Sequence, residues 1–255
     1  MNMRKIPATA WRRVPEITAW FWITKVITTA LGEATSDFLV FRISPPVAVG
    51  LGALGFLGAL GLQLAMRRYL PWVYWLTVTM VAIFGTMAAD VLHVGFGVPY
   101  AVSTGFFAVV LAVVFTLWYR VEKTLSVHSI YTFRRELFYW TTVVVTFALG
   151  TAAGDLAAST AGLGYFSAGL VFAGLIAVPA LVYWKLHTGE VAMFWLAYIL
   201  TRPLGASFAD WAGKSKAIGG LGFGDGSVSL VLGVVLVICV GYMSLNRPEL
   251  KREST

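Results

Sequence analysis

Four aspartates stand inside long apolar stretches of this chain, where a carboxylate is unusual. They are Asp37, Asp90, Asp155 and Asp210. An ionised side chain that faces lipid near the bilayer centre costs roughly 2.5–3.5 kcal/mol. Acidic residues at such positions therefore tend to line a polar cavity or an ion path, and their oxygens suit a hard cation. The structural alternative is that each aspartate caps a helix or pairs with a neighbour near the outer interface.

Each aspartate ends a pattern that occurs four times. An aromatic residue precedes a Trp, a Gly follows ten positions after the Trp, and a small residue and the Asp come four and five positions after the Gly. The tryptophans are Trp22, Trp75, Trp140 and Trp195, and the glycines are Gly32, Gly85, Gly150 and Gly205. Four identical spacings indicate that the chain consists of four copies of one unit.

Further charges accompany the pattern in the first and fourth repeats. On a helix that turns 100° per residue, one side of the first span carries a polar set: Lys25, Thr28, Thr29, Glu33 and Asp37. In the fourth repeat, Arg202 takes the position of Thr29. Glu33 and the four aspartates are candidate metal ligands, and the threonines with water could complete a hydrated site. Lys25 and Arg202 are either structural counter-ions or competitors of a transported cation for these carboxylates.

The Trp and Gly positions have structural explanations as well. Trp favours the headgroup level of a bilayer, so the four tryptophans are interpreted as an interface belt, with path lining or gating as the alternative. Each Gly forms a small-x-x-x-small face with the small residue that follows it. Such faces let helices approach closely in a membrane. We expect these faces to draw the four Trp-bearing spans, and with them the aspartates, together.

The composition indicates a membrane protein. Of the 255 residues, 58% are hydrophobic and 12% are charged, whereas an ordinary soluble domain carries about 25% charged residues. Spanning a bilayer takes about 20 apolar residues. Eight runs qualify, at about 17–40, 46–66, 72–94, 99–119, 137–158, 163–186, 191–211 and 228–246. We expect an all-α polytopic protein with one transmembrane domain, whose repeats cover about 17–66, 72–120, 137–187 and 191–246.

The basic residues predict the orientation. Most of the 19 Lys and Arg fall before the first span, after even-numbered spans or after the last span. The positive-inside rule then places both termini in the cytoplasm, for a multi-pass protein of the cell inner membrane. All four units cross in the same direction, as parallel repeats in a pseudo-fourfold ring of hairpins. The membrane topology thus explains the net charge of +7. We expect lipid and a small cation as partners, and no nucleic acid. A homo-oligomer remains an open alternative.

Other kinds of chemistry find little support in the sequence. We find no nucleophile–base arrangement, no metalloprotease signature and no pair of cysteines, since Cys239 is single. We therefore expect no enzyme and no cofactor beyond a bound divalent cation. His93 follows Asp90 by three residues and could share a transition metal with it, although a water-exposed histidine is the simpler interpretation. A buried Lys25 could form a Schiff base with an aldehyde cofactor.

The fourfold pattern resembles the bacterial membrane proteins that are built of four tandem two-span repeats and classed as the DUF347 repeat family. The resemblance rests on the Trp, Gly and Asp positions and covers about residues 17–246. It implies the repeat architecture. It implies no substrate, because the family is one of unknown function.

The residues themselves therefore carry the functional expectation. We expect a membrane transporter or channel for a cation, with a divalent metal ion as one candidate and proton coupling as a variant that fits equally. The alternative is a non-transporting binding or assembly protein, in which the buried acids and bases form a structural ion-pair network.

Overall fold

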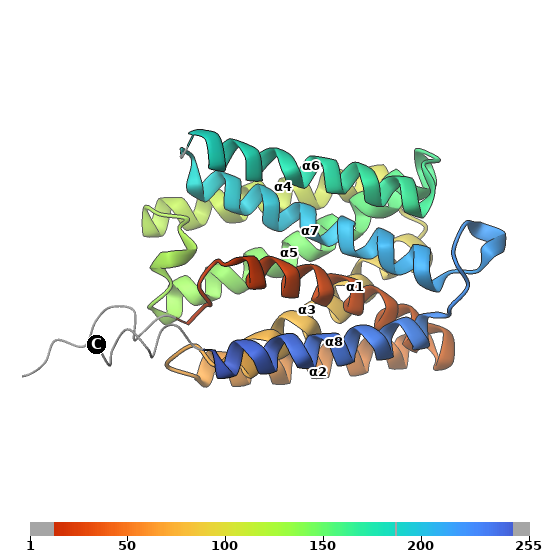
Figure 1. The fold of residues 1–255 in the computed structure, drawn as a ribbon, viewed down its shortest axis with the longest axis horizontal. Coiled ribbons are helices and arrows are strands. Elements are labelled where there is room, and N and C mark those ends of the chain that lie inside the picture. Colours follow the sequence, from red (N-terminus) through yellow and green to blue (C-terminus); the bar gives the residue numbers. More distant parts are fainter. Residues whose placement is uncertain (1–12, 187, 247–255) are drawn as a thin grey trace, which may run out of the picture.

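A computed structural model describes residues 13–186 and 188–246, and it is all-helical over those residues (Figure 1). The eight long helices are α1 (Ala19–Arg42), α2 (Pro45–Ala65), α3 (Pro71–Asp90), α4 (Tyr100–Glu122), α5 (Phe133–Asp155), α6 (Gly164–Leu186), α7 (Glu190–Gly213) and α8 (Asp225–Leu245). Two π-helices, η2 (Val91–Gly95) and η4 (Leu156–Thr160), continue α3 and α5 directly. Two 3-10 turns, η3 (Val127–Ser129) and η5 (Lys216–Ile218), lie in connections.

Seven of these helices, α2 to α8, are long and apolar enough to cross a membrane. The chain is therefore a multi-pass helical membrane protein by length and composition. The helix outside this set is α1, which has 24 residues and includes the charged Lys25, Glu33 and Asp37. Lys25 and Glu33 are buried inside the bundle. Lys25 and Glu33, which lower the hydropathy of α1, thus face the protein interior.

The four Trp-bearing helices form a closed inner ring, in which α1 packs on α3, α3 on α5, α5 on α7 and α7 on α1. The repeated glycines lie at these contacts. Each glycine abuts a residue that stands seven positions after the Trp of the next repeat. The pairs are Gly32 with Ala82, Gly85 with Phe147, Gly150 with Arg202, and Gly205 with Thr29. One contact thus occurs four times around the ring, which gives the bundle its pseudo-fourfold character.

The remaining helices cover the ring from outside. Each packs mainly on the ring helix of the following repeat: α2 on α3, α4 on α5, α6 on α7, and α8 on α1. Figure 1 shows α1 between α7 and α8. The expected ring of hairpins therefore needs correction, because the two helices of one sequence repeat are not the main packing pair. The last helix of the chain closes the bundle against the first.

The helix ends follow local sequence rules. The hydroxyls of Thr18 and Thr132 accept hydrogen bonds from backbone N–H groups in the first turns of α1 and α5, which satisfies donors that a helix leaves free. Prolines occupy the first turn of α2 and α3, where a missing N–H costs nothing. The outer faces of α2, α4, α6 and α8 expose many Leu, Val and Phe side chains, as lipid contact requires.

Candidate functional site

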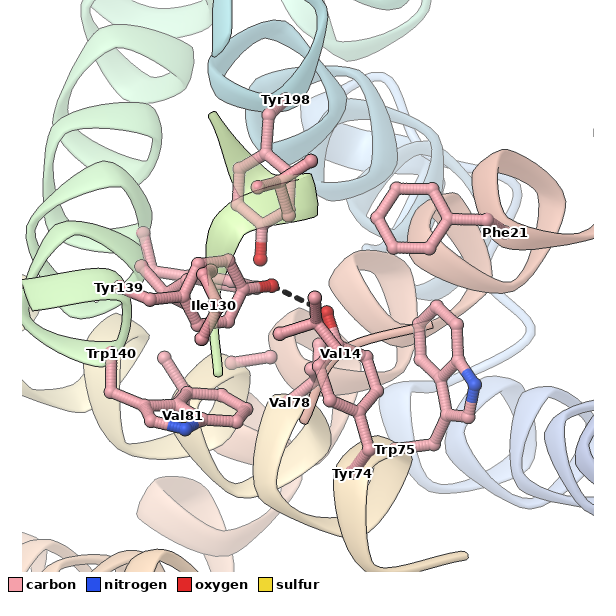
Figure 2. Close-up of a cluster of buried hydrophobic side chains, with 14 of the residues drawn as sticks. Val14, Phe21, Tyr74, Trp75, Val78, Val81, Ile130, Tyr139, Trp140 and Tyr198 are labelled. Atoms are coloured by element: carbon pink, nitrogen blue, oxygen red, sulfur yellow. Dashed lines mark hydrogen bonds between the residues drawn. The ribbon is translucent and has the colours of Figure 1, made fainter. Parts of the chain in front are cut away.

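Aromatic side chains close one end of the ring, where the four ring helices begin (Figure 2). The hydroxyls of Tyr74 and Tyr139 share a hydrogen bond of 2.5 Å. Val14, from the segment before α1, and Ile130, from the connection between α4 and α5, are buried among the rings. We call this the apolar end. Its side chains belong to one continuous core cluster.

The repeated tryptophans belong to this closure. Trp75, Trp140 and Trp195 are only 1%, 2% and 4% exposed, whereas an interface belt requires rings at the surface. The Trp195 indole N–H donates to the Leu125 carbonyl at 2.9 Å. Trp22 is partly exposed and packs against Phe194. These rings therefore fix the apolar end of the bundle rather than a membrane surface.

A buried carboxylate that the sequence reasoning overlooked ties the apolar end together. Glu136 is fully buried and accepts hydrogen bonds from Arg13 and, at 2.8 Å, from the Gln63 amide. The bond to Arg13 anchors the segment that precedes α1. The available signal was a single acid directly after Arg134 and Arg135 at the start of a span.

Lys25 lies deeper in the ring and is fully buried. Its Nζ is 4.1 Å from the ring centre of Phe147 and 4.3 Å from that of Tyr198. It has no hydrogen-bond partner among the described residues. The hydroxyls of Thr28 and Thr29 donate to backbone carbonyls of their own helix at 2.7 Å. Each hydroxyl thus donates its proton within α1 and keeps its oxygen lone pairs as acceptors.

A single guanidinium joins all four ring helices in the next layer. Arg202 of α7 is 1% exposed, and its Nη2 donates to Glu33 at 2.5 Å, to the Thr151 hydroxyl at 2.9 Å and to the Thr86 hydroxyl. Glu33, Thr86 and Thr151 hold the same repeat position in α1, α3 and α5. The fourth repeat has the small Ala206 at that position. Repeat symmetry therefore places these groups around one point.

The four aspartates lie one helical turn beyond this layer, at the other end of the ring. Asp210 is 6% exposed, and the other three are partly exposed. Glu33 interacts electrostatically with all four. Oxygens of Glu33, Asp37 and Asp210 lie within 4.8 Å of one another and could hold a metal ion. We call Glu33 and the four aspartates the acidic vestibule.

A third base enters the acidic vestibule from outside the helices. Lys214, the residue that follows α7, forms an ion pair with Asp37 and lies 3.8 Å from Asp210 and 4.0 Å from Asp225. Burial lowers the pKa of Lys214, but the carboxylates of Asp37, Asp210 and Asp225 outweigh burial and raise the pKa. Lys214 therefore stays charged. Its position four residues after Asp210 was the one signal in the sequence.

Asp90 and Asp155 differ from the other two aspartates. Each is the last residue of an α-helix that passes directly into a π-helix, a feature that is frequent at functional sites. The ion pairs of the acidic vestibule involve Glu33, Asp37 and Asp210. In the described part of the chain, no hydrogen bond or ion pair engages the carboxylate of Asp90 or Asp155. They are the acids that remain available to a ligand.

Two other features fall outside the acidic vestibule. His93 is buried, its Nδ1 lies 3.0 Å from the Val98 carbonyl and its Nε2 lies 3.3 Å from the Ser103 hydroxyl. Both ring nitrogens are thus engaged, and the possible metal pair with Asp90 finds no support. A cavity of about 590 Å³ opens near the apolar end among α1, α6 and α7. Its lining is mainly apolar and includes none of the acidic vestibule.

Fold and site together define a multi-pass helical membrane protein whose four repeats surround an acidic interior. The chain belongs to the family described as Repeat of Unknown Function (DUF347), which matches residues 20–69, 73–124, 138–188 and 193–248. No curated protein and no solved structure matches the chain. The family description carries no substrate, so the function must be argued from the site.

Proposed function

We propose that the chain is a transporter or channel for a small cation, with divalent metal ions as the first candidates, and that the acidic vestibule is its ion site. One observation carries the proposal. Asp90 and Asp155 are partly exposed at the end of the ring opposite the apolar end, and neither forms a direct ion pair with a base among the described residues. Partly exposed carboxylates without a direct ion pair attract a cation.

The charge balance of the acidic vestibule supports the same proposal. Five carboxylates gather there, and the bases that bond to them are Arg202 and Lys214. The bases thus leave negative charge uncompensated when the acids are ionised. Carboxylate oxygens are the preferred ligands of hard divalent cations. The partial exposure of three aspartates also allows water to remain on a bound ion.

The proposal includes a topology. We place eight spans in the cell inner membrane, with α1 as the eighth and both termini in the cytoplasm, from the distribution of basic residues. The apolar end then faces the cytoplasm, and the acidic vestibule faces outward. The packed aromatic core at the cytoplasmic end supports assigning the described conformation to a state that is closed on that side. A transporter must open that end during its cycle, and a channel must open it to conduct.

A second function class has an observation of its own. Glu33 is paired with Arg202, and Lys214 with Asp37 and Asp210. In a non-transporting assembly protein, these pairs would form a static network that holds the ring together. Replacing an aspartate would then change the stability of the protein, and neither wild type nor the variant would show cation flux.

Cation flux into liposomes tests the proposal. Purified protein is reconstituted, and entry of Mn²⁺, Ca²⁺ and K⁺ is followed with entrapped indicators. We expect flux of at least one of these ions in wild type, and its loss in Asp90→Asn and Asp155→Asn variants that still insert. The control is Glu190→Gln, which removes an exposed acid at the opposite end. Absence of flux for all three ions, or wild-type flux in every single Asp→Asn variant, refutes the proposal.

A further inference from the structure

Lys25 is a buried amine for which the described structure provides no acid. It lies between the rings of Phe147 and Tyr198, and its Nζ has no hydrogen-bond partner among the described residues. Aromatic faces attract a cation, but they accept no conventional hydrogen bond. A protonated amine in such a site keeps donors unsatisfied, which is costly in a buried environment.

A second cation shares the same aromatic ring. The Cζ of Arg202 lies 5.8 Å from the centre of Phe147, and the Nζ of Lys25 lies 4.1 Å from it. Of these two bases, Arg202 has an acidic partner, Glu33, and Lys25 has none among the described residues. Guanidinium groups keep their proton in proteins, whereas a lysine can release its own. Of the two bases, Lys25 is therefore the one that can lose its charge.

The other groups near Lys25 offer no counter-charge. The helices packed on α1 are α2, α3, α7 and α8, and α5 contributes Phe147 across the ring. Helix α2 has no titratable side chain. The titratable groups of the other helices in this region are hydroxyls, one thiol and one guanidinium: Tyr74 of α3, Tyr139 of α5, Tyr198 and Arg202 of α7, and Cys239 of α8. Glu33 stands two turns further along α1, on the path to the aspartates. It is the first acid that a moving Lys25 side chain would meet.

We infer that Lys25 is the proton-carrying group of the proposed transport cycle, and that the arrangement described here is its uncharged form. When the acidic vestibule is empty of cation, a hydronium ion there gives its proton to the lone pair of Nζ and becomes water, and the ammonium turns toward Glu33. When a cation enters, the N–H bond breaks and the proton returns to water. This inference rests on the proposed function and names protons as its coupling ion.

The protonation state can be measured without any transport. In the unfolded chain, Lys25 is exposed and carries a proton up to about pH 10. In the presence of saturating Ca²⁺, the folded chain should hold the amine uncharged, so that unfolding takes up one proton and stability rises with pH. The unfolding constant of wild type, divided by that of Lys25→Met, should then fall about tenfold per pH unit over at least one unit between pH 6 and 9.5. A ratio that stays constant over this range overturns the inference.

Coupling is measured in the same liposomes as cation flux. An entrapped pH indicator reports proton movement while the cation that wild type transports enters. In wild type and in Glu190→Gln, we expect protons to leave the liposomes as cations enter. In Lys25→Met, we expect no proton movement to accompany the cation. An unchanged number of protons per cation in Lys25→Met refutes the coupling. If wild type transports none of the ions, the proposed function fails by itself, and the pH dependence of unfolding still decides the state of Lys25.

Discussion

The pair formed by Arg202 and Glu33 permits the most quantitative prediction, because it joins all four ring helices at one point. Arg202 is 1% exposed and Glu33 is 5% exposed. Their bond measures 2.5 Å, and Thr86 and Thr151 complete the arrangement. Replacing Arg202 with Met leaves the acid buried without its base. Replacing Glu33 with Gln leaves the guanidinium with only hydroxyl partners.

The expected magnitudes follow from desolvation. Removing one partner of a buried ion pair costs about 3–5 kcal/mol, because an uncompensated charge remains in a medium of low polarity. Replacing both partners with neutral groups of similar size is often neutral or stabilising. We therefore expect Arg202→Met to lower the midpoint of thermal unfolding by about 10 °C, at roughly 2–4 °C per kcal/mol for a chain of this size. The double variant with Glu33→Gln should recover most of that loss.

A double-mutant cycle measures this coupling. Thermal unfolding in detergent micelles is recorded for wild type, both single variants and the double variant, with Arg134→Met as an exposed control. Arg134 is 67% exposed, and Glu122 keeps its bond to Arg135 when Arg134 is replaced, so this change should cost only about 0–1 kcal/mol. A coupling of about 3 kcal/mol or more supports a buried ion pair between Arg202 and Glu33, one helical turn from the aspartates. Additive single effects would show that Arg202 and Glu33 act independently, which contradicts the reasoning.

Two further predictions concern packing around the ring. Gly32→Ala should destabilise by about 1–3 kcal/mol, because a Cβ there would lie 2.8 Å from the Ala82 backbone carbonyl carbon. Gly58→Ala is the matched control, since nothing lies within 4 Å of its Cβ position, and equal unfolding midpoints for the two variants would contradict the assigned contact. Trp195→Phe should cost about 1 kcal/mol or more, because it removes the 2.9 Å bond to the Leu125 carbonyl. Hydrogen exchange in the connection between α4 and α5 should rise in that variant, and unchanged exchange would show that the bond does not hold the connection.

Much of the architecture could be predicted because the same residue types recur at the same positions in all four repeats. The Trp–Gly–Asp spacing fixes which helices are equivalent, and small residues at fixed positions indicate where those helices meet. The structure places Gly32 and its three counterparts at equivalent ring contacts. Equivalent contacts in turn bring Glu33 close enough to act on all four aspartates.

The pairing of ring and outer helices could not be predicted in the same way. Every repeat presents similar apolar faces, so α2 can satisfy its contacts on α1 or on α3. Both arrangements preserve the fourfold pattern, and they differ only in which helix closes the bundle. The observed choice puts α8 on α1. Periodicity contains no information that distinguishes the two, because the repeats are related by the same shift.

The positions of some residues could not be predicted, because they depend on the connections between helices rather than on the helices themselves. Lys214 reaches the acidic vestibule because the chain turns just after α7. Glu136 is buried where Arg13, which lies ahead of α1, pairs with its carboxylate at the start of α5. Trp75 can serve at a lipid interface or in a core, since its ring is both apolar and polar. Nothing within a single span decides among such alternatives.

The central claim is that carboxylates from four equivalent helices share a hydrated interior that holds a cation. A density map of the protein prepared with Mn²⁺, read together with elemental analysis of the same sample, tests it most directly. We predict a bound ion or ordered water among Asp90, Asp155 and the neighbouring vestibule acids, and its loss in the Asp90→Asn and Asp155→Asn double variant. A dry interior, in which every carboxylate is paired one-to-one with a base and no metal accompanies the protein, would contradict the account.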